Sequence, residues 1–439
     1  MSEPGNTPES GASAPVEGGA PVPEVPLWTV LREWGRIGCI GFGGPPAHIR
    51  LLRRLCVERE GWLDAREFED AIAVCNLMPG PASTQLAIFC AWRLRGRPGG
   101  LIGGAAFIVP GLIVILALSV LFVSGSPPLW VLGAGAGAGA AVPAVAVSAG
   151  WSLLGASRRN HRAAVRWLSY LAAGLAAAAT AGAWLVLVLL GCGVVEAATR
   201  RAVVRRAAGA DGPPSGNAGG GPVSGGGGVT GGGVTGGGAA GRLRSIIAAP
   251  AVLAAGGAAT GGVLASVAWE AFKVGGLSFG GGFVIIPLMQ ADAVSHYRWM
   301  TGAQFLNAVA LGQITPGPVV QTVSAVGYAA AGIAGGLLAA AVAFAPSFAI
   351  VLLGGPHFAR IRGNADARAF LDGAGPAAIG AILGSAITLT RALTHPWQYL
   401  VLAGALILLI PLRRGVVLTL LSAAAIGVTI ALAAGTVSP

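Results

Sequence analysis

Polar side chains gather around two Pro-Gly-Pro motifs, residues 79–81 and 316–318, which interrupt apolar stretches of the chain. Proline removes a backbone donor and clashes with the preceding turn, so a helix should break at each motif. The helix that follows a break presents free N–H groups and a positive dipole end. Asn76 and Gln85 flank the first motif and Gln313 the second, together with Ser83, Thr84, Thr315, Gln321, Thr322 and Ser324. This combination suits the binding of an anion, although the same side chains also join helices in membranes.

Charged residues form two similar pairs elsewhere in the chain. Glu33 and Arg36 are three residues apart, and so are Glu270 and Lys273. This spacing puts each pair on one helical face, where it can neutralise itself. In a site, Arg36 and Lys273 would attract an anion, while Glu33 and Glu270 would release them or carry a coupled proton. His48 adds a titratable group in one half of the chain only.

The composition is that of an integral membrane protein. Of 439 residues, 54% are hydrophobic and only 10% are charged, whereas soluble domains carry about 25% charged residues. Apolar runs long enough to cross a bilayer occur at 101–123, 131–154, 167–195, 335–354 and 399–433, the last long enough for two helices, with a shorter run at 377–390. Helices are expected, because lipid offers backbone groups no other partners and the runs lack the alternation of a membrane barrel.

Other function classes find little support in the sequence. The net charge of +11 would suggest nucleic acid in a soluble protein, but the arginines fall mainly in short loops between apolar runs, as on the cytoplasmic face of membrane proteins. The five cysteines show no CxxC spacing, so neither a disulfide framework nor a metal site is indicated. HExxH and Walker motifs are absent, which argues against an enzyme and against ATP-driven transport. We expect no cofactor and no nucleic-acid partner.

The sequence contains an internal repeat. With a shift of 237 residues, positions 34–81 match 271–318 at 14 of 48 positions, including Phe42-Gly43-Gly44 on Phe279-Gly280-Gly281, Trp62 on Trp299 and the two Pro-Gly-Pro motifs. The register then slips by one, and Gly96 and Pro110 match Gly332 and Pro346. We interpret the chain as a duplicated membrane module.

Loop charges predict that the two copies are inverted. Arg93, Arg95 and Arg97 follow the first Pro-Gly-Pro motif, whereas the matching stretch 327–336 is uncharged. The next pair of loops reverses this pattern, since 124–128 is uncharged and 356–368 carries three arginines. Equivalent loops therefore lie on opposite sides of the membrane, with the C-terminus outside.

Two kinds of helix break are expected in each copy. Arginine-rich segments on both sides of the first Pro-Gly-Pro motif favour a re-entrant hairpin that turns at residues 79–81. The Phe-Gly-Gly motifs, followed by Pro45 in the first copy and Gly282 in the second, favour an unwound turn where backbone can approach a ligand closely. Such backbone is tolerated at membrane depth only inside protein or beside a water-filled cavity.

These observations predict an all-α polytopic membrane protein with two inverted-topology repeats, broken or re-entrant helices and about 10–13 membrane segments. Residues 1–26 and 207–245 are rich in Gly, Pro and Ser and are expected to be a disordered tail and a flexible linker. The two repeats then occupy 27–206 and 246–439.

At these motifs the sequence resembles the chromate ion transporter family in its long, two-domain form. The resemblance is carried by "GFGGPPAHI", Trp62, "LMPGPASTQLAIFCAWRLRGRPGGLIGGAAFIVPG", "FGGGFVIIPLM" and "ITPGPVVQTVSAVGYAAAGIAGGLLAAAVAFAPSF", and it covers about 33–111 and 270–348. It implies a multi-pass carrier of the bacterial inner membrane that exports chromate and confers chromate resistance, with sulfate as a related oxyanion. It also implies functional motif residues at Phe42, Gly43, Gly44, Pro45, Pro79, Gly80, Pro81, Phe279, Gly280, Gly281, Pro316, Gly317 and Pro318.

Several alternatives stay open at this point. A passive anion channel could use the same broken helices, although duplicated re-entrant segments favour alternating access. A carrier for another divalent oxyanion such as sulfate is equally compatible, because sulfate and chromate share shape and charge. The expected partners are the oxyanion and the lipid bilayer, and a homo-oligomer is compatible with the sequence.

Overall fold

The computed structural model describes residues 25–123, 127–160, 164–180, 185–210, 259–278, 282–354 and 365–434. Within these segments the chain is helical, with no strand, and five helices are long and apolar enough to cross a membrane. The expected all-α polytopic class is thereby confirmed. The tail 1–24, most of the linker, and residues 279–281 of the second Phe-Gly-Gly motif lie outside the described residues.

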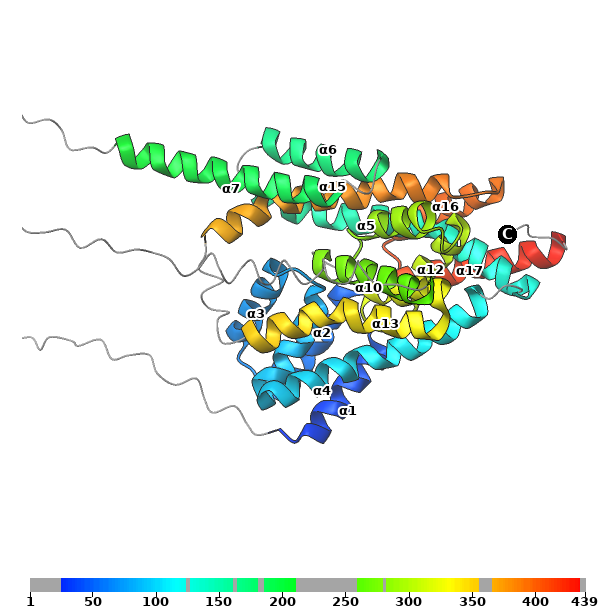
Figure 1. Ribbon diagram of the computed structural model, residues 1–439, viewed down its shortest axis with the longest axis horizontal. Helices are drawn as coiled ribbons and strands as arrows, with labels where there is room; N and C mark the ends of the chain where they lie inside the picture. Colours follow the sequence, from blue (N-terminus) through cyan, green and yellow to red (C-terminus); the bar gives the residue numbers. More distant parts are fainter. Residues whose placement is uncertain are drawn as a thin grey trace, which may run out of the picture.

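The first half contains helices α1 to α7, and the second half contains α10 to α17 (Figure 1). The elements of the first half are α1 (Leu27–Ile40), α2 (Pro45–Arg53), the π-helical η1 (Arg54–Arg59), α3 (Ala65–Leu77), α4 (Ala82–Val123), α5 (Leu129–Asn160), α6 (Ala164–Thr180) and α7 (Leu185–Ala210). Those of the second half are α10 (Ala259–Leu277), α11 (Ile286–Gln290), η3 (Ala291–His296), α12 (Gly302–Ile314), η4 (Val319–Gln321), α13 (Thr322–Gly354), α15 (Ala365–Arg391), α16 (Pro396–Leu409) and α17 (Val416–Ala434).

The two halves repeat each other in local detail. The π-helical segments η1 and η3, and the helices α3 and α12, are each offset by the 237 residues of the sequence repeat. Asp64 and Thr301, which are equivalent, cap the N-termini of α3 and α12 with their side chains. The duplication predicted from the sequence is therefore visible as a duplicated order of elements.

A sharp reversal divides both α4 and α13. Arg95 and Gly96 have φ of −140° and 59°, and the equivalent Ala331 and Gly332 have −149° and 61°. A Cβ on Gly99 would lie 2.3 Å from the carbonyl oxygen of Ala91, a contact that eight residues of straight helix, about 12 Å long, could not make. Residues 82–94 therefore fold back against the rest of α4, and glycine supplies the left-handed conformation of the turn.

Short helices lead to and from each break. Helix α3 and residues 82–94 of α4 have 13 residues each, about 20 Å, which is too short for a hydrocarbon core of about 30 Å. Glu67 near the start of α3 forms an ion pair with Arg93 near the end of the returning segment. The open ends of the hairpin thus meet, as expected for a re-entrant hairpin that turns at residues 79–81.

Helices α4 and α13 show how the halves are related. Gly100 of α4 packs against Leu352 of α13, and Gly336 of α13 packs against Leu116 of α4. Residues 100 and 116 are equivalent to 336 and 352, so each contact is the repeat of the other. The two equivalent helices run antiparallel, as inverted copies require.

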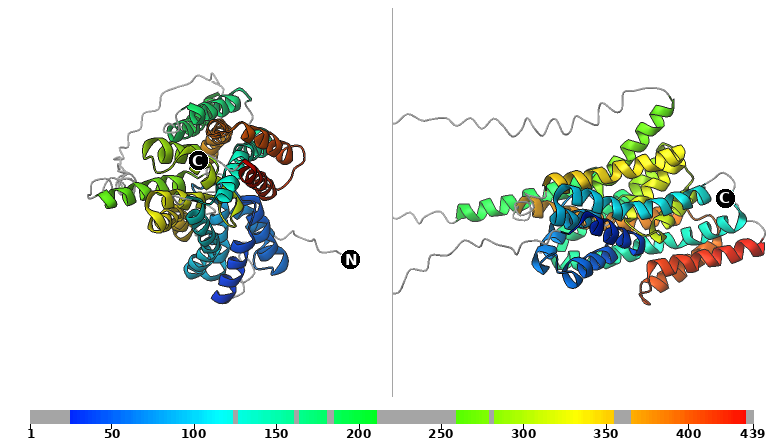
Figure 2. Two further views of the ribbon diagram at one scale, coloured as in Figure 1. Left: turned by 90° about the vertical axis from the view of Figure 1, so that its right-hand side faces the viewer. Right: turned by 90° about the horizontal axis from the view of Figure 1, so that it is seen from below.

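The outer helices are exchanged between the halves. Helices α6 and α7 of the first half pack on α15 of the second, and α16 and α17 of the second half pack on α5 of the first. Figure 1 shows α6, α7 and α15 side by side, and Figure 2 shows the red C-terminal helix beside teal α5. The apolar run 167–195, expected as one segment, contains parts of two helices, α6 and α7. The run 399–433 contains α16 and α17, as expected.

Candidate functional site

The first Pro-Gly-Pro motif forms the turn between α3 and α4. Gly80 has φ of 120°, and the side-chain amide of Gln85 donates to the carbonyl oxygen of Pro79 at 2.6 Å. Thr84 and Gln85 are fully buried in the first turn of α4, whereas Asn76 at the end of α3 is exposed. The motif thus joins a buried set of polar groups to an accessible surface.

The second Pro-Gly-Pro motif packs directly against the first half. Residues 315–318 are buried, and the backbone N–H of Gly317 donates to the carbonyl oxygen of Gly41 at 3.0 Å. The side chain of Gln321 donates to the carbonyl oxygen of Ile108 on α4 at 2.6 Å. Helix α4 approaches so closely at Gly111 that a Cβ there would lie 2.1 Å from the carbonyl oxygen of Pro316. Gln313, at the end of α12, is also buried.

The first Phe-Gly-Gly motif forms the unwound turn between α1 and α2. Phe42 and Gly43 are exposed, Gly44 is buried with φ of 71°, and Pro45 opens α2. A Cβ on Gly44 would touch Val319 at 3.5 Å, and one on Gly282 would touch Val320 at 3.1 Å. Gly44 of the first motif, Gly282, which follows the second motif in the sequence, and the second Pro-Gly-Pro motif therefore meet at the start of η4.

His48 links two breaks within the first half. Its Nε2 lies 2.8 Å from the carbonyl oxygen of Gly41, and its Nδ1 lies 3.3 Å from the hydroxyl of Ser83. A carbonyl oxygen only accepts, so Nε2 carries the proton in the neutral ring and Nδ1 accepts from Ser83. The buried imidazole also stands edge-on to Phe107, with ring centroids 4.9 Å apart. His48 thus holds the Phe-Gly-Gly turn against the helix after the first Pro-Gly-Pro motif.

The charged pairs lie within helices, about two turns before the Phe-Gly-Gly breaks. The guanidinium of Arg36 lies 4.0 Å from the carboxylate of the buried Glu33, whereas the guanidinium of Arg59, from η1, lies closer to it, at 2.9 Å. In the second half Lys273 lies 2.6 Å from Glu270 and also contacts Asp292 of η3. The predicted pairs are therefore in contact, but each belongs to a cluster that joins two helices. Arg59 and Asp292 could not be found from spacing, since they lie far from their partners in sequence.

Several buried polar atoms near the breaks have no hydrogen-bond partner within the described part of the chain. They are the hydroxyls of Thr84, Ser278, Ser324 and Ser347, the side-chain oxygens of Gln85 and Gln321, and the amide nitrogen of Gln313. A buried polar group without a partner costs about 1–3 kcal/mol, so this concentration indicates a functional region rather than ordinary helix packing. Ser347, on α13, does not lie in either predicted polar cluster.

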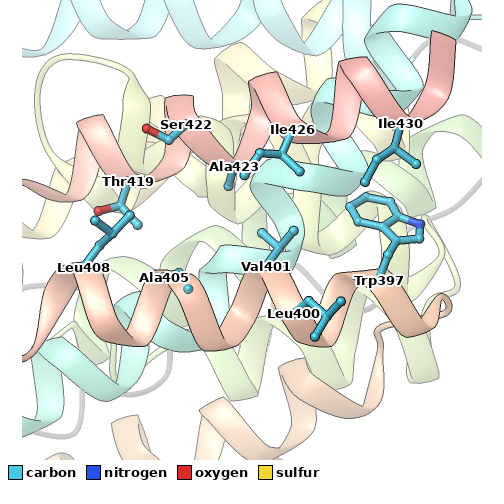
Figure 3. Close-up of a pocket in the computed structure, with 11 residues that line it drawn as sticks. Trp397, Leu400, Val401, Ala405, Leu408, Thr419, Ser422, Ala423, Ile426 and Ile430 are labelled. Atoms are coloured by element: carbon cyan, nitrogen blue, oxygen red, sulfur yellow. The ribbon is translucent and has the colours of Figure 1, made fainter. Parts of the chain in front are cut away.

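A groove between α16 and α17 has a different character (Figure 3). Trp397 and Ile430 line one end of it, and Leu408 and Thr419 line the other. Its polar groups, Thr419 and Ser422, donate their hydroxyl protons to carbonyl oxygens one turn earlier in their own helix. The groove is lined mainly by apolar side chains and therefore suits an apolar chain better than an anion. Among the described residues no three metal-ligating side chains gather to hold a metal ion.

Known proteins resemble the chain over both halves. The family model described as chromate transporter matches residues 28–197 and 265–428. The chromate transport protein of Cupriavidus metallidurans is 29% identical over 84% of this chain and 84% of its own length. The probable chromate transport protein of Synechococcus elongatus is 27% identical over 85% and 87%, and the chromate transport protein of Pseudomonas aeruginosa is 28% identical over 81% and 79%. No solved structure shows a significant match.

Proposed function

The chain belongs to the chromate transporter family, and from this premise we propose that it exports chromate from the cytoplasm by alternating access between its two inverted halves. The cell membrane of a bacterium, with arginine-rich ends of the first half inside, is the proposed location. Chromate efflux of this kind would confer chromate resistance. The source of energy would be an ion gradient, because the sequence has no Walker motif.

One observation carries the proposed mechanism. The hydrogen bond from Gly317 to Gly41 joins the Pro-Gly-Pro break of one half to the Phe-Gly-Gly break of the other. A rocking motion of one inverted half against the other, as in other carriers with broken helices, would open and close this contact. The breaks are therefore suited to act at the boundary between the moving parts, where a carrier holds its substrate.

The chemistry of the breaks fits a tetrahedral dianion. Helix N-termini, hydroxyls and side-chain amides donate hydrogen bonds, and charge-assisted hydrogen bonds are the stronger kind. The predicted binding residues Phe42, Gly43, Gly44, Pro45, Asn76, Gln85, Gln313 and the two Pro-Gly-Pro motifs stay a proposal, with Phe279, Gly280 and Gly281 outside the described residues. Arg36 and Lys273 would act at longer range, and Glu33, Glu270 and His48 are the candidates for ion coupling.

Flux into inside-out membrane vesicles tests this proposal. Vesicles that contain the protein should accumulate radiolabelled chromate when a proton gradient is imposed, and vesicles that contain Gly44→Val should not. Unlabelled sulfate added in excess measures whether the carrier accepts sulfate as well. Chromate entry that follows only its own gradient, with no response to any ion gradient, would instead identify a passive channel.

A further inference from the structure

Two buried hydroxyls from opposite halves have no hydrogen-bond partner within the described chain. Thr84 lies in the first turn of α4, and Ser347 lies on α13 of the second half. Both residues are fully buried, with exposures of 0%. In a membrane interior, serine and threonine ordinarily donate to a carbonyl of their own helix, as Ser119 does to Ile115 at 2.7 Å. Thr84 and Ser347 keep their donors unused.

The hydroxyl of Ser347 lies against the first Pro-Gly-Pro turn. A Cβ placed on Gly80 would be 2.9 Å from this hydroxyl and 2.6 Å from the side-chain nitrogen of Gln85. The turn, the first turn of α4 and a donor from the other half therefore come together around Gly80. The N–H groups of Thr84 and Gln85 donate to the carbonyl oxygen of Pro81, so the backbone donors that the start of α4 leaves open are those of Ala82 and Ser83.

The equivalent place in the second half is built differently. At the spacing of 236 residues that follows the Pro-Gly-Pro motifs, the counterpart of Ser347 is Gly111 and the counterpart of Thr84 is Val320, so neither hydroxyl is repeated. The amide of Gln321 is already bound to Ile108, and Gly111 lies directly against the carbonyl oxygen of Pro316. Carbonyl oxygens repel an anion. Two donors near the second break, the amide of Gln313 and the hydroxyl of Ser324, also have no partner in the described chain. Backbone contacts nevertheless close the second turn itself, whereas the unpartnered hydroxyl of Ser347 lies against the first turn.

From this asymmetry we propose that the transported oxyanion binds at the first Pro-Gly-Pro break alone, where the hydroxyls of Thr84 and Ser347 and the N-terminus of α4 donate to it. The proposal rests on the proposed function and assigns the substrate site within it. The ligand class is a tetrahedral oxyanion with two negative charges, which chromate and sulfate share. Since Ser347 comes from the second half, a bound anion holds the two halves together. The anion can reach the buried donors only when the two halves move apart.

Binding of radiolabelled chromate to the purified full-length protein, with sulfate as a parallel ligand, tests the site. Loss of one hydrogen bond to a charged ligand should weaken binding roughly ten- to a hundredfold. We expect this loss for Thr84→Val and for Ser347→Ala, and we expect Thr84→Ser to restore wild-type affinity. Ser119→Ala removes a hydroxyl that already has a partner, and Ser324→Ala removes the unpartnered hydroxyl near the second break. Both controls should bind like the wild type.

The outcomes separate this inference from the proposed function. If the wild type binds chromate and Thr84→Val and Ser347→Ala bind it equally well, the site assignment is wrong although chromate transport stands. A loss on Ser324→Ala as large as on Ser347→Ala would overturn the asymmetry. If the wild type binds sulfate but no chromate, and the variants lose sulfate binding, the site is supported and the chromate proposal fails. Should Thr84→Val not fold, as judged by thermal unfolding, Thr84→Ala takes its place.

Discussion

Arg59, rather than Arg36, should be the residue that stabilises the buried carboxylate of Glu33. Its guanidinium donates to that carboxylate at 2.9 Å, whereas Arg36 lies 4.0 Å away with 61% of its side chain exposed. A hydrogen bond to a charged group contributes about 1.5–3 kcal/mol, and an exposed ion pair usually less than about 1 kcal/mol. Because only 7% of the Glu33 side chain is exposed, water cannot readily replace the lost partner. Arg32 lies 3.4 Å from the other carboxylate oxygen, but 71% of its side chain is exposed, so its contribution is expected to be small.

Thermal unfolding in detergent, followed by intrinsic tryptophan fluorescence, measures this difference. Arg59→Gln should lower the melting temperature by several degrees, whereas Arg36→Gln, the matched control, should change it little. Glu33→Gln combined with Arg59→Gln should recover much of the loss, since the buried carboxylate that lost its hydrogen-bonded partner is then gone. An equal or larger effect of Arg36→Gln would refute the reasoning and favour the pairing expected from the three-residue spacing.

Three further predictions concern the breaks and the inversion. Gly111→Ala should abolish chromate flux, because its Cβ would overlap the Pro316 carbonyl oxygen by more than 1 Å, whereas Gly276→Ala, with open space at its Cβ, should transport normally. Gly44→Val should also stop flux without loss of membrane insertion, since a β-branched residue resists φ of 71°; normal flux would assign Gly44 to packing only. In a cysteine-free background, Arg95→Cys and Ala331→Cys should react with impermeant reagents from opposite faces, and labelling from one face would contradict the inverted repeat.

Much of the architecture could be predicted from the sequence because the chain contains the same membrane module twice. Matched Pro-Gly-Pro motifs predicted both helix breaks, and loop charge predicted the inversion that the antiparallel packing of α4 and α13 now supports. The arginines at 93–97 predicted a loop between the re-entrant hairpin and the apolar run 101–123, and the chain reverses there, at Arg95 and Gly96. That Gly96 supplies the left-handed turn was not predicted, although Gly96 and Gly332 match in the repeat.

The candidate site was harder to predict, because its partners come from distant segments. The repeat and the polar clusters located Gln85 and Gln321, yet no local pattern indicates that Gln321 is bound to Ile108, 213 residues away. Ser347 stands alone in an apolar helix, and only the packing of α13 on the first half brings it to Gly80. Arg59 was missed for the same reason, since it lies in η1, 26 residues from Glu33, and only the fold brings the two side chains together.

The exchange of outer helices between the halves bears on biogenesis. Helices α6 and α7 leave the ribosome well before α15, the helix on which they pack, has been synthesised. Their buried carboxylate, Glu196, is already held by Arg166 at 3.2 Å and by Arg200 at 3.0 Å, and both arginines belong to the same hairpin. The newly inserted hairpin therefore neutralises its own buried carboxylate, and Arg200 gains Asp372 only when α15 arrives. Neither half can complete its packing alone, so quality control in the membrane should act on the whole chain.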